Sequence, residues 1–237
     1  MKINKQSNIY TIIYIVVLVA VVGTGLAFTS MGLRGRQEDN ANADKMQQIL
    51  AAARISAPTK DVIATFDKVI TRQVVVNSEG DSIGSDAFDI DMAKEMKLSP
   101  ERRQLPVFVA DVEGQTKYVV PVRGNGLWGP IWGYIAFNSD GNTIYGAYFA
   151  HEGETPGLGA EIEKPAFSDQ FRGKVLFKDG RFLPVNVLKV GTKPQQGEDY
   201  VDAVSGGTIT SKGVAAMLDQ GLTPYEAYLR KVSSANN

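Results

Sequence analysis

An uninterrupted apolar run opens the chain, and it predicts a membrane helix. Ile9–Phe28 has 20 residues without a charge. As an α-helix this segment is about 30 Å long, which matches the hydrocarbon core of a bilayer. We therefore predict a single N-terminal transmembrane helix within a membrane anchor that spans residues 1–33.

A cleaved signal peptide is the alternative interpretation of the same segment. Lys2 and Lys5 form a basic start, and Gly25 and Ala27 have the small side chains of a cleavage site. The apolar part of a signal peptide has about 7–15 residues, so the longer run favours a retained anchor. Basic residues flank both ends of the run, so the positive-inside rule does not choose an orientation.

Helical patterns dominate residues 34–104, which we interpret as a helical linker and the start of a soluble domain. The expected elements are a helix over Asn40–Ile55, a second helix that Thr59 and Asp61 cap and that runs to Ile70, a strand at Val74–Val76, a turn at Asn77–Gly80 and a short helix near Ile90–Met96. The stretch from residue 81 to residue 104 has no steady period, so its loop and short helix are the least defined by pattern.

From residue 105 onward the pattern changes to the alternation of strands. The expected strands are Val107–Asp111, Lys117–Arg123, Trp132–Asn138 and Thr143–His151, followed by a helix near Pro165–Phe171, a hairpin of Lys174–Phe177 with Phe182–Leu188, and helices at Ile209–Gln220 and Pro224–Val232, the last capped by Thr223. Short links between the strands favour antiparallel pairing. The predicted fold class is α+β: a single N-terminal transmembrane helix, then one domain with an antiparallel sheet and flanking helices, with its main part at residues 105–237.

The amino-acid composition excludes several classes of function. Lys+Arg 25 against Asp+Glu 26 gives a formal net charge of -1, which argues against a nucleic-acid partner. The absence of cysteine excludes disulfides, thiolate catalysis and iron–sulfur ligation by this chain alone. Because the chain has one histidine, multi-histidine metal sites are excluded as well, and we expect no metal site.

A glycine-rich loop follows the second expected strand of the sheet. Gly124–Gly129 matches the spacing G-x-G-x-x-G, but Pro130 and a strand-like segment follow where a dinucleotide-binding fold requires a helix. The loop is better interpreted as one whose glycines allow a close approach of the backbone and whose two tryptophans, Trp128 and Trp132, form an aromatic shelf. A hairpin that merely packs on the core is the alternative.

The loop from His151 to Gly159 combines acids with a rigid turn. His151 could act as a general base, but a strand-end histidine in a polar setting is the favoured interpretation. Glu154 and Glu161 are better interpreted as solvated than as a glycosidase acid pair. Between them, a proline and two glycines allow backbone N–H groups to approach a flat ligand.

The segment Asp202–Val214 is a small-residue turn that leads into an amphipathic helix. Unpaired N–H groups at a helix start favour a phosphate, and Lys212 lies in the first turn. An ordinary N-cap is the alternative, because serine and threonine side chains commonly accept hydrogen bonds from those N–H groups.

Three separated motifs carry a resemblance to a known family. Asp202-x-x-Ser205-Gly206-Gly207-Thr208 resembles the flavinylation motif D-x-x-[S/T]-G-A-T, in which a transferase joins FMN through its phosphate to the last threonine. The other two motifs are Arg123-Gly124-x-Gly126-Leu127-Trp128 and Glu154-Thr155-Pro156-Gly157-Leu158-Gly159. Over nearly its whole length the chain resembles the family of C subunits of the sodium-translocating NADH:quinone oxidoreductase. Gly207 departs from the pattern, because the family usually has alanine there.

The resemblance implies a covalent flavin site. It places the FMN phosphoester on Thr208 and the phosphate at the helix start, with cofactor contacts from Ser205, Gly206, Gly207, Ile209, Thr210 and Lys212. It places the isoalloxazine ring, with its edge left open toward a neighbouring protein of the complex, against Glu154, Thr155, Leu158, Gly159 and Trp128. Asp202 would serve recognition by the FMN transferase. No residue of this chain is expected to catalyse substrate chemistry.

The family also implies partners and a location. It predicts a carrier that relays single electrons between redox centres of neighbouring subunits, the membrane subunits B, D and E especially, in a complex that oxidises NADH, reduces quinone and exports sodium. The expected setting is the bacterial inner membrane, with the anchor in the lipid bilayer and the soluble domain in the periplasm. Two alternatives stay open: the G subunit of the related Rnf ferredoxin:NAD complex, and a membrane-anchored anion-binding protein without a redox role.

Overall fold

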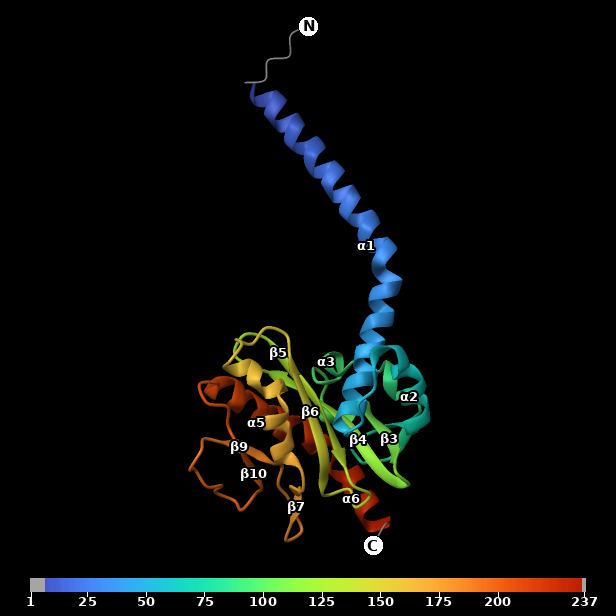
Figure 1. The fold of residues 1–237 in the computed structure, drawn as a ribbon, viewed down its shortest axis with the longest axis vertical. Coiled ribbons are helices and arrows are strands. Elements are labelled where there is room, and N and C mark those ends of the chain that lie inside the picture. Colours follow the sequence, from blue (N-terminus) through green and yellow to red (C-terminus); the bar gives the residue numbers. More distant parts are fainter. Residues whose placement is uncertain (1–6, 236–237) are drawn as a thin grey trace. The chain divides into compact units, whose positions relative to one another are not determined.

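The computed structural model describes residues 7–235, which divide into two compact units between Lys45 and Met46. Figure 1 shows the chain coloured from its N-terminus to its C-terminus. Lys2 and Lys5, the basic start considered for a signal peptide, lie outside the described residues.

The N-terminal apolar run lies in one long helix, α1 (Asn8–Ala52). An 18-residue window of this helix has a mean hydropathy of 2.5, so the helix is apolar and long enough to cross a membrane. Two successive helices were expected here, but no proline interrupts the segment, and the Arg34–Glu38 ion pair one turn apart supports continuous helix. The amphipathic helix expected at Asn40–Ile55 therefore continues the anchor helix.

The end of α1 belongs to the second unit. Ile49 and Leu50 are fully buried there. The side-chain oxygen of Gln48 accepts a hydrogen bond from Trp132 Nε1 at 2.9 Å. Trp132 thus contacts α1, so the expected shelf of two tryptophans beside the glycine loop is wrong.

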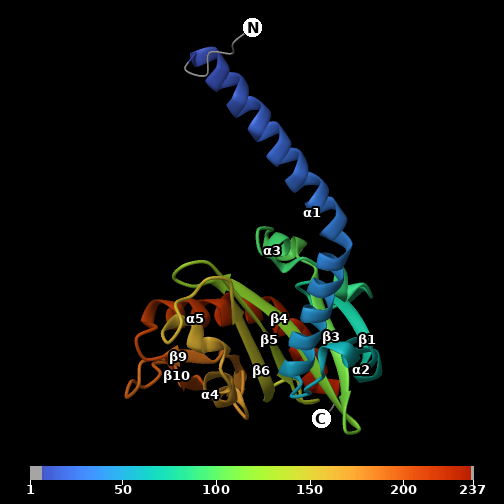
Figure 2. The same cartoon turned by 45° about the horizontal axis from the view of Figure 1, so that its top comes forward.

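The second unit is built on a six-stranded antiparallel sheet with the strand order β2-β1-β3-β4-β5-β6. Figure 2 labels β1, β3, β4, β5 and β6 of this sheet. Its strands are β1 (Ile70–Val76), β2 (Ser82–Gly84), β3 (Leu105–Val112), β4 (Gln115–Asn125), β5 (Pro130–Phe137) and β6 (Ile144–His151). The antiparallel sheet and its four consecutive hairpin strands, β3 to β6, confirm the α+β prediction. β2 was not predicted, because three exposed residues carry no alternation.

The predicted hairpin after β6 is partly wrong. β7 (Phe177–Lys178) and β8 (Arg181–Phe182) form a short hairpin, but the chain then leaves it. Pro184 has no N–H to donate, so pairing does not continue through it. β9 (Asn186–Leu188) instead pairs in parallel with β10 (Tyr200–Asp202), a strand that was not predicted.

The helices flank the sheet. They are α2 (Val62–Val69), α3 (Met92–Glu95), α4 (Pro165–Ser168), α5 (Thr208–Leu222) and α6 (Glu226–Ala235), with 3-10 turns at Thr59–Asp61, Ala87–Asp89, Pro100–Arg102, Gly159–Glu163, Asp169–Phe171 and Thr223–Tyr225. The Thr223 hydroxyl donates to the Asp219 carbonyl instead of capping the last helix. Asp61 precedes α2, but its side chain makes no capping hydrogen bond.

Helix α5 packs closely against the end of β4, as Figure 2 shows. A Cβ at Gly124 would lie 2.7 Å from Met217 Cβ, and a Cβ at Gly213 would collide with the Asn125 carbonyl oxygen. Two glycines thus let the helix approach the strand. This packing sets the first turn of α5 beside the glycine loop that follows β4.

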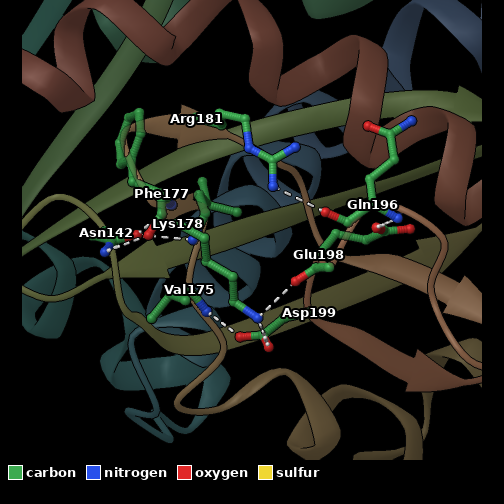
Figure 3. Close-up of polar contacts among 10 residues, drawn as sticks. Asn142, Val175, Phe177, Lys178, Arg181, Gln196, Glu198 and Asp199 are labelled. Atoms are coloured by element: carbon green, nitrogen blue, oxygen red, sulfur yellow. Dashed lines mark hydrogen bonds and ion pairs between the residues drawn. The ribbon is translucent and has the colours of Figure 1, made fainter.

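A polar network fastens the segment that precedes β10 (Figure 3). The Asp199 carboxylate accepts hydrogen bonds from Lys178 Nζ at 2.8 Å and from the Val175 N–H at 2.7 Å. Burial alone would raise the pKa of Asp199, but these two donors outweigh it and hold the pKa below its usual value. The network fixes the start of β10, and therefore the position of Asp202 at its end.

Candidate functional site

Three segments that are far apart in the sequence meet at one pocket of about 230 Å³. They are the glycine loop between β4 and β5, the turn after β6, and the first turn of α5. The residues that line the pocket are Leu127, Glu154, Thr155, Leu158, Gly159, Gly206, Gly207, Thr208, Ile209 and Thr210. The structure therefore brings together the three motifs that sequence analysis selected.

The glycine loop is the tip of the β4–β5 hairpin. The Gly126 N–H donates to the Gly129 carbonyl at 2.8 Å, and β5 begins directly after the loop. No helix starts here, so the dinucleotide-binding interpretation is excluded. The loop presents Leu127 and Trp128 to solvent, with exposed fractions of 48% and 69%. It supplies an apolar rim to one side of the pocket.

The turn after β6 forms the opposite wall. The N–H groups of Leu158 and Ala160 both donate to the Thr155 carbonyl, at 3.1 and 3.2 Å. The Leu158 side chain packs over Gly206, where a Cβ would lie 2.6 Å from Leu158 Cδ2 and where φ is +74°. Gly206 is therefore needed both for its backbone conformation and for this contact.

Glu154 lines the pocket but has an exposed fraction of only 4%. Its Oε1 accepts a hydrogen bond from the Trp128 N–H at 2.8 Å, and its Oε2 accepts one from the Thr210 hydroxyl at 2.5 Å. Burial would raise the pKa of Glu154, but these donors and the Leu127 N–H outweigh it and hold the pKa below its usual value. The expectation of a solvated Glu154 is wrong: it is a buried carboxylate.

The first turn of α5 has no side-chain cap. Gly207 occupies the N-cap position, and its carbonyl accepts from the Ser211 N–H at 2.9 Å. The N–H groups of the first three helical residues, 208–210, have no partner within the helix. The Thr208 side chain is exposed at the pocket. The alternative of an ordinary serine or threonine cap is therefore wrong.

Four predicted site residues lie outside the pocket lining. Trp128 contributes its backbone N–H to Glu154, while Ser205 and Lys212 are exposed near the start of α5. Asp202 is exposed at the end of β10, and its N–H donates to Gln170 Oε1 at 2.9 Å.

One residue of the pocket lining, Leu127, was not predicted from the sequence as a site residue. Leu127 lines the pocket, although sequence analysis singled out only its neighbour Trp128 on this loop. Its place in the motif Arg123-Gly124-x-Gly126-Leu127-Trp128 was the available signal.

His151 has a structural role beside the pocket. Its Nδ1 accepts a hydrogen bond from the Glu154 N–H at 3.1 Å, and its Nε2 lies 3.6 Å from Glu163 Oε1. Because both ring nitrogens face protein groups, the polar strand-end interpretation fits the contacts better than a general base.

Residues 126–223 match the family described as the FMN-binding domain. These residues include every residue that lines the pocket. The match therefore covers the glycine loop from Gly126 onward, the turn after β6 and the first turn of α5.

Curated relatives cover nearly the whole chain. The C subunit of the Na(+)-translocating NADH-quinone reductase of Vibrio anguillarum is 32% identical over 97% of this chain and 98% of its own length. The protein of the same name from Pseudomonas aeruginosa is 32% identical over 96% and 98%.

Solved structures are also similar to this chain. The crystal structure of the Na(+)-translocating NADH-quinone reductase C subunit from Parabacteroides distasonis has 48% identity and a TM-score of 0.78, and the match covers 83% of this chain and 96% of that one. Shewanella oneidensis NqrC has 27% identity and a TM-score of 0.68, with 82% and 99% covered. With a shared fold, a match to the FMN-binding domain and relatives that cover 96–97% of its length, the chain belongs to the family of C subunits of the Na(+)-translocating NADH-quinone reductase.

Proposed function

We propose that the chain is the covalent-FMN electron-carrier subunit of a membrane NADH:quinone reductase coupled to sodium export. The names of its relatives and the FMN-binding domain match support this assignment over the Rnf alternative. The single observation that carries the proposal is the exposed Thr208 hydroxyl at an uncapped helix start inside the pocket. The activity belongs to the whole complex, and this chain relays single electrons within it.

The residues of the pocket fit an FMN at both of its ends. For the phosphate, the free N–H groups at the start of α5 supply donors, and the helix dipole contributes about 0.3–1 kcal/mol toward an anion. For the ring, Leu127, Leu158 and Ile209 supply apolar surface. Thr155 adds a hydroxyl to the same lining.

Thr208 is the proposed attachment point. Its Oγ1 would lose its proton to an FMN transferase and displace a leaving group from the phosphorus of an activated flavin nucleotide, such as a nucleoside monophosphate from a flavin dinucleotide. Gly206 and Gly207, which precede Thr208, add no side chains of their own beside this hydroxyl. Asp202, exposed and held in place at the end of β10, is the proposed recognition residue for the transferase. When bound, FMN would supply a one-electron redox centre.

The rim of the pocket suits electron relay better than substrate chemistry. Leu127, Trp128 and Ile209 are at least 48% exposed, so the site is open on that side. The buried carboxylate of Glu154 is already engaged by protein donors and is not free to act as an acid or base. We propose that the open side faces a neighbouring redox centre, in the membrane subunits B, D or E.

The ring position can be tested at Leu158. Leu158→Lys places a charge where apolar ring contact is expected, so the flavin absorption spectrum and electron transfer should change. Attachment at Thr208 should persist, because the covalent bond forms at the phosphate end. A variant with a wild-type flavin spectrum would contradict this ring position.

We further propose that α1 anchors the chain in the bacterial inner membrane with Met46–Asn237 in the periplasm. The chain has no cysteine, so a single Lys193→Cys substitution on an exposed residue gives a clean probe. A membrane-impermeant maleimide should label this cysteine in intact spheroplasts. Labelling that requires lysis would contradict the periplasmic orientation.

Covalent attachment is tested by denaturing gels of the full-length protein produced together with an FMN transferase. Flavin fluorescence should comigrate with the wild-type chain and be lost from Thr208→Ala, whereas Thr208→Ser should label partly because it keeps a hydroxyl. Thr192→Ala removes another exposed threonine and should label fully. Fluorescence that persists on Thr208→Ala would refute the attachment site. An unlabelled wild-type chain would favour the non-redox anion-binding alternative.

A further inference from the structure

The first turn of α5 is held in an unusual way. A helix start is commonly fastened by a serine, threonine or aspartate whose side chain accepts from the N2 or N3 N–H group. Here the N-cap is Gly207, which has no side chain. The turn is fastened instead through two of its own side chains: the Thr210 hydroxyl donates to Glu154 Oε2, and Ser211 Oγ accepts from the Val204 N–H.

Glu154 connects this turn to the other two walls of the pocket. Its Oε1 accepts from the Trp128 N–H in the glycine loop, and its own backbone N–H donates to His151 Nδ1 at the end of β6. One buried side chain thus links the glycine loop to the first turn of α5, while its backbone is tied to β6.

Glycines make room for this carboxylate. A Cβ at Gly126 would lie 2.5 Å from Glu154 Oε1. A Cβ at Gly159 would collide with Glu154 Oε2 and with Thr210 Oγ1. Because alanine would not fit at either position without a shift, the surrounding backbone is shaped around Glu154 and Thr210.

We propose that Glu154, acting through Thr210, is a positioning residue that replaces the helix cap and so leaves the N–H groups at the start of α5 free for the flavin phosphate. This inference rests on the proposed function and deepens it. A conventional cap would occupy an N–H group that the phosphate needs. A clamp through the Thr210 side chain holds the same turn, and therefore Thr208, without using those donors.

The assignment changes the role expected of Glu154. Sequence analysis grouped it with the residues that contact the flavin ring. Both of its oxygens are engaged by protein donors, at 2.8 and 2.5 Å. Its effect on the flavin is therefore exerted through the positions of Trp128 and Thr210.

The test compares Thr210→Val, which removes the hydroxyl at nearly constant volume, with Thr210→Ser, which keeps it. Glu154→Ala removes the other half of the clamp. Tyr225→Phe is the matched stability control, because it also deletes a buried hydroxyl, one that donates to the Pro106 carbonyl beyond the far end of α5. The full-length variants are produced with the transferase, and covalent flavin is followed over time by fluorescence of the denatured chain.

Thr210→Val and Glu154→Ala should label about ten- to hundredfold more slowly than wild type, because a small displacement of a reacting group costs that much. Thr210→Ser should restore labelling, and Tyr225→Phe should leave it unchanged. Wild-type labelling rates in both clamp variants would overturn the proposal. Equal slowing in Tyr225→Phe would also overturn it, because the effect would then be one of general stability.

Amide hydrogen exchange of the flavin-free chain gives a second readout that does not depend on FMN. The Ser211 N–H, which donates to the Gly207 carbonyl, should exchange faster in Thr210→Val than in wild type, while amides in the last turn of α5 should not change. Unchanged exchange at Ser211 would overturn the clamp even if the wild-type chain is flavinylated. If the wild-type chain is not flavinylated, the proposed function fails, and this exchange result still decides whether the clamp exists.

Discussion

Gly159→Ala is the substitution that most directly probes how the pocket is assembled. The added Cβ would collide with Glu154 Oε2 and Thr210 Oγ1, so the collision falls on the hydrogen bond that joins them. Gly159 does not have the positive φ that would strain any side chain, so the effect is one of space. Gly153→Ala, six residues earlier in the same loop, is the matched control because its Cβ would meet nothing within 4 Å.

The expected difference in Tm follows from the surroundings of Gly159 and Gly153. Inserting a methyl group into a well-packed site costs about 1–3 kcal/mol. For a domain of this size 1 kcal/mol corresponds to about 2–4 °C in Tm, so the collision should lower the Tm of Gly159→Ala by about 2–12 °C relative to Gly153→Ala. Replacing a glycine also stabilises by about 0.4–1 kcal/mol through the unfolded chain, and this term is shared by both variants. The difference between the two variants therefore isolates the collision.

The assay is thermal unfolding of the flavin-free full-length protein in detergent, followed by circular dichroism. Gly159→Ala should melt below wild type, and Gly153→Ala should melt at or slightly above it. If the two variants have equal Tm values, the close approach of Gly159, Glu154 and Thr210 is refuted, together with the pocket built on it.

Other predictions concern the membrane helix and the response to pH. Val17→Arg, at the centre of the apolar run, should cost about 2.5–3.5 kcal/mol in membrane insertion. This cost should be seen as loss of the chain from the membrane fraction. An N-terminal sequence of the mature chain that begins near residue 28 would show a cleaved signal peptide instead of an anchor. The folded pKa values of Glu154, Glu198 and Asp199 lie below their usual values, so the unfolded chain binds more protons in acid. Urea unfolding should therefore show stability falling as the pH drops from about 5 through the folded pKa values, and less steeply in Glu154→Gln. Burial raises the pKa of Tyr228 to about 12, so its contribution to stability should be lost as the pH rises from about 10 to 12, as measured by ultraviolet titration with unfolding.

Long, regular patterns in the sequence predicted most of the fold. The strands from Leu105 to His151 are rich in β-branched and aromatic residues and are joined by short turns, so their pairing followed from local information. β10 has three residues, and an irregular loop over residues 189–199 separates it from its partner β9. Parallel pairing of such short segments depends on the network around Asp199, which no local pattern reports.

The sequence predicted which segments form the site, but it predicted fewer of the contacts between their residues. The spacing of the motif that ends at Thr208 located the start of α5, and the turn around Leu158 was placed in the same pocket. The burial of Glu154 was not predictable, because glutamate is rarely buried and its partners Trp128 and Thr210 are 26 and 56 residues away. Only the folded chain brings these donors to one carboxylate.

Covalent FMN on Thr208 underlies both proposals, and tandem mass spectrometry of the tryptic peptide that contains Thr208 is the sharpest test of it. This peptide, Val190–Lys212, contains five hydroxyl side chains besides the tyrosine: Thr192, Ser205, Thr208, Thr210 and Ser211. We predict that Thr208 alone carries the mass of an attached FMN, which is the mass of FMN less one water. An unmodified peptide from protein produced with the transferase, or the same mass on any of the other four residues, would contradict it.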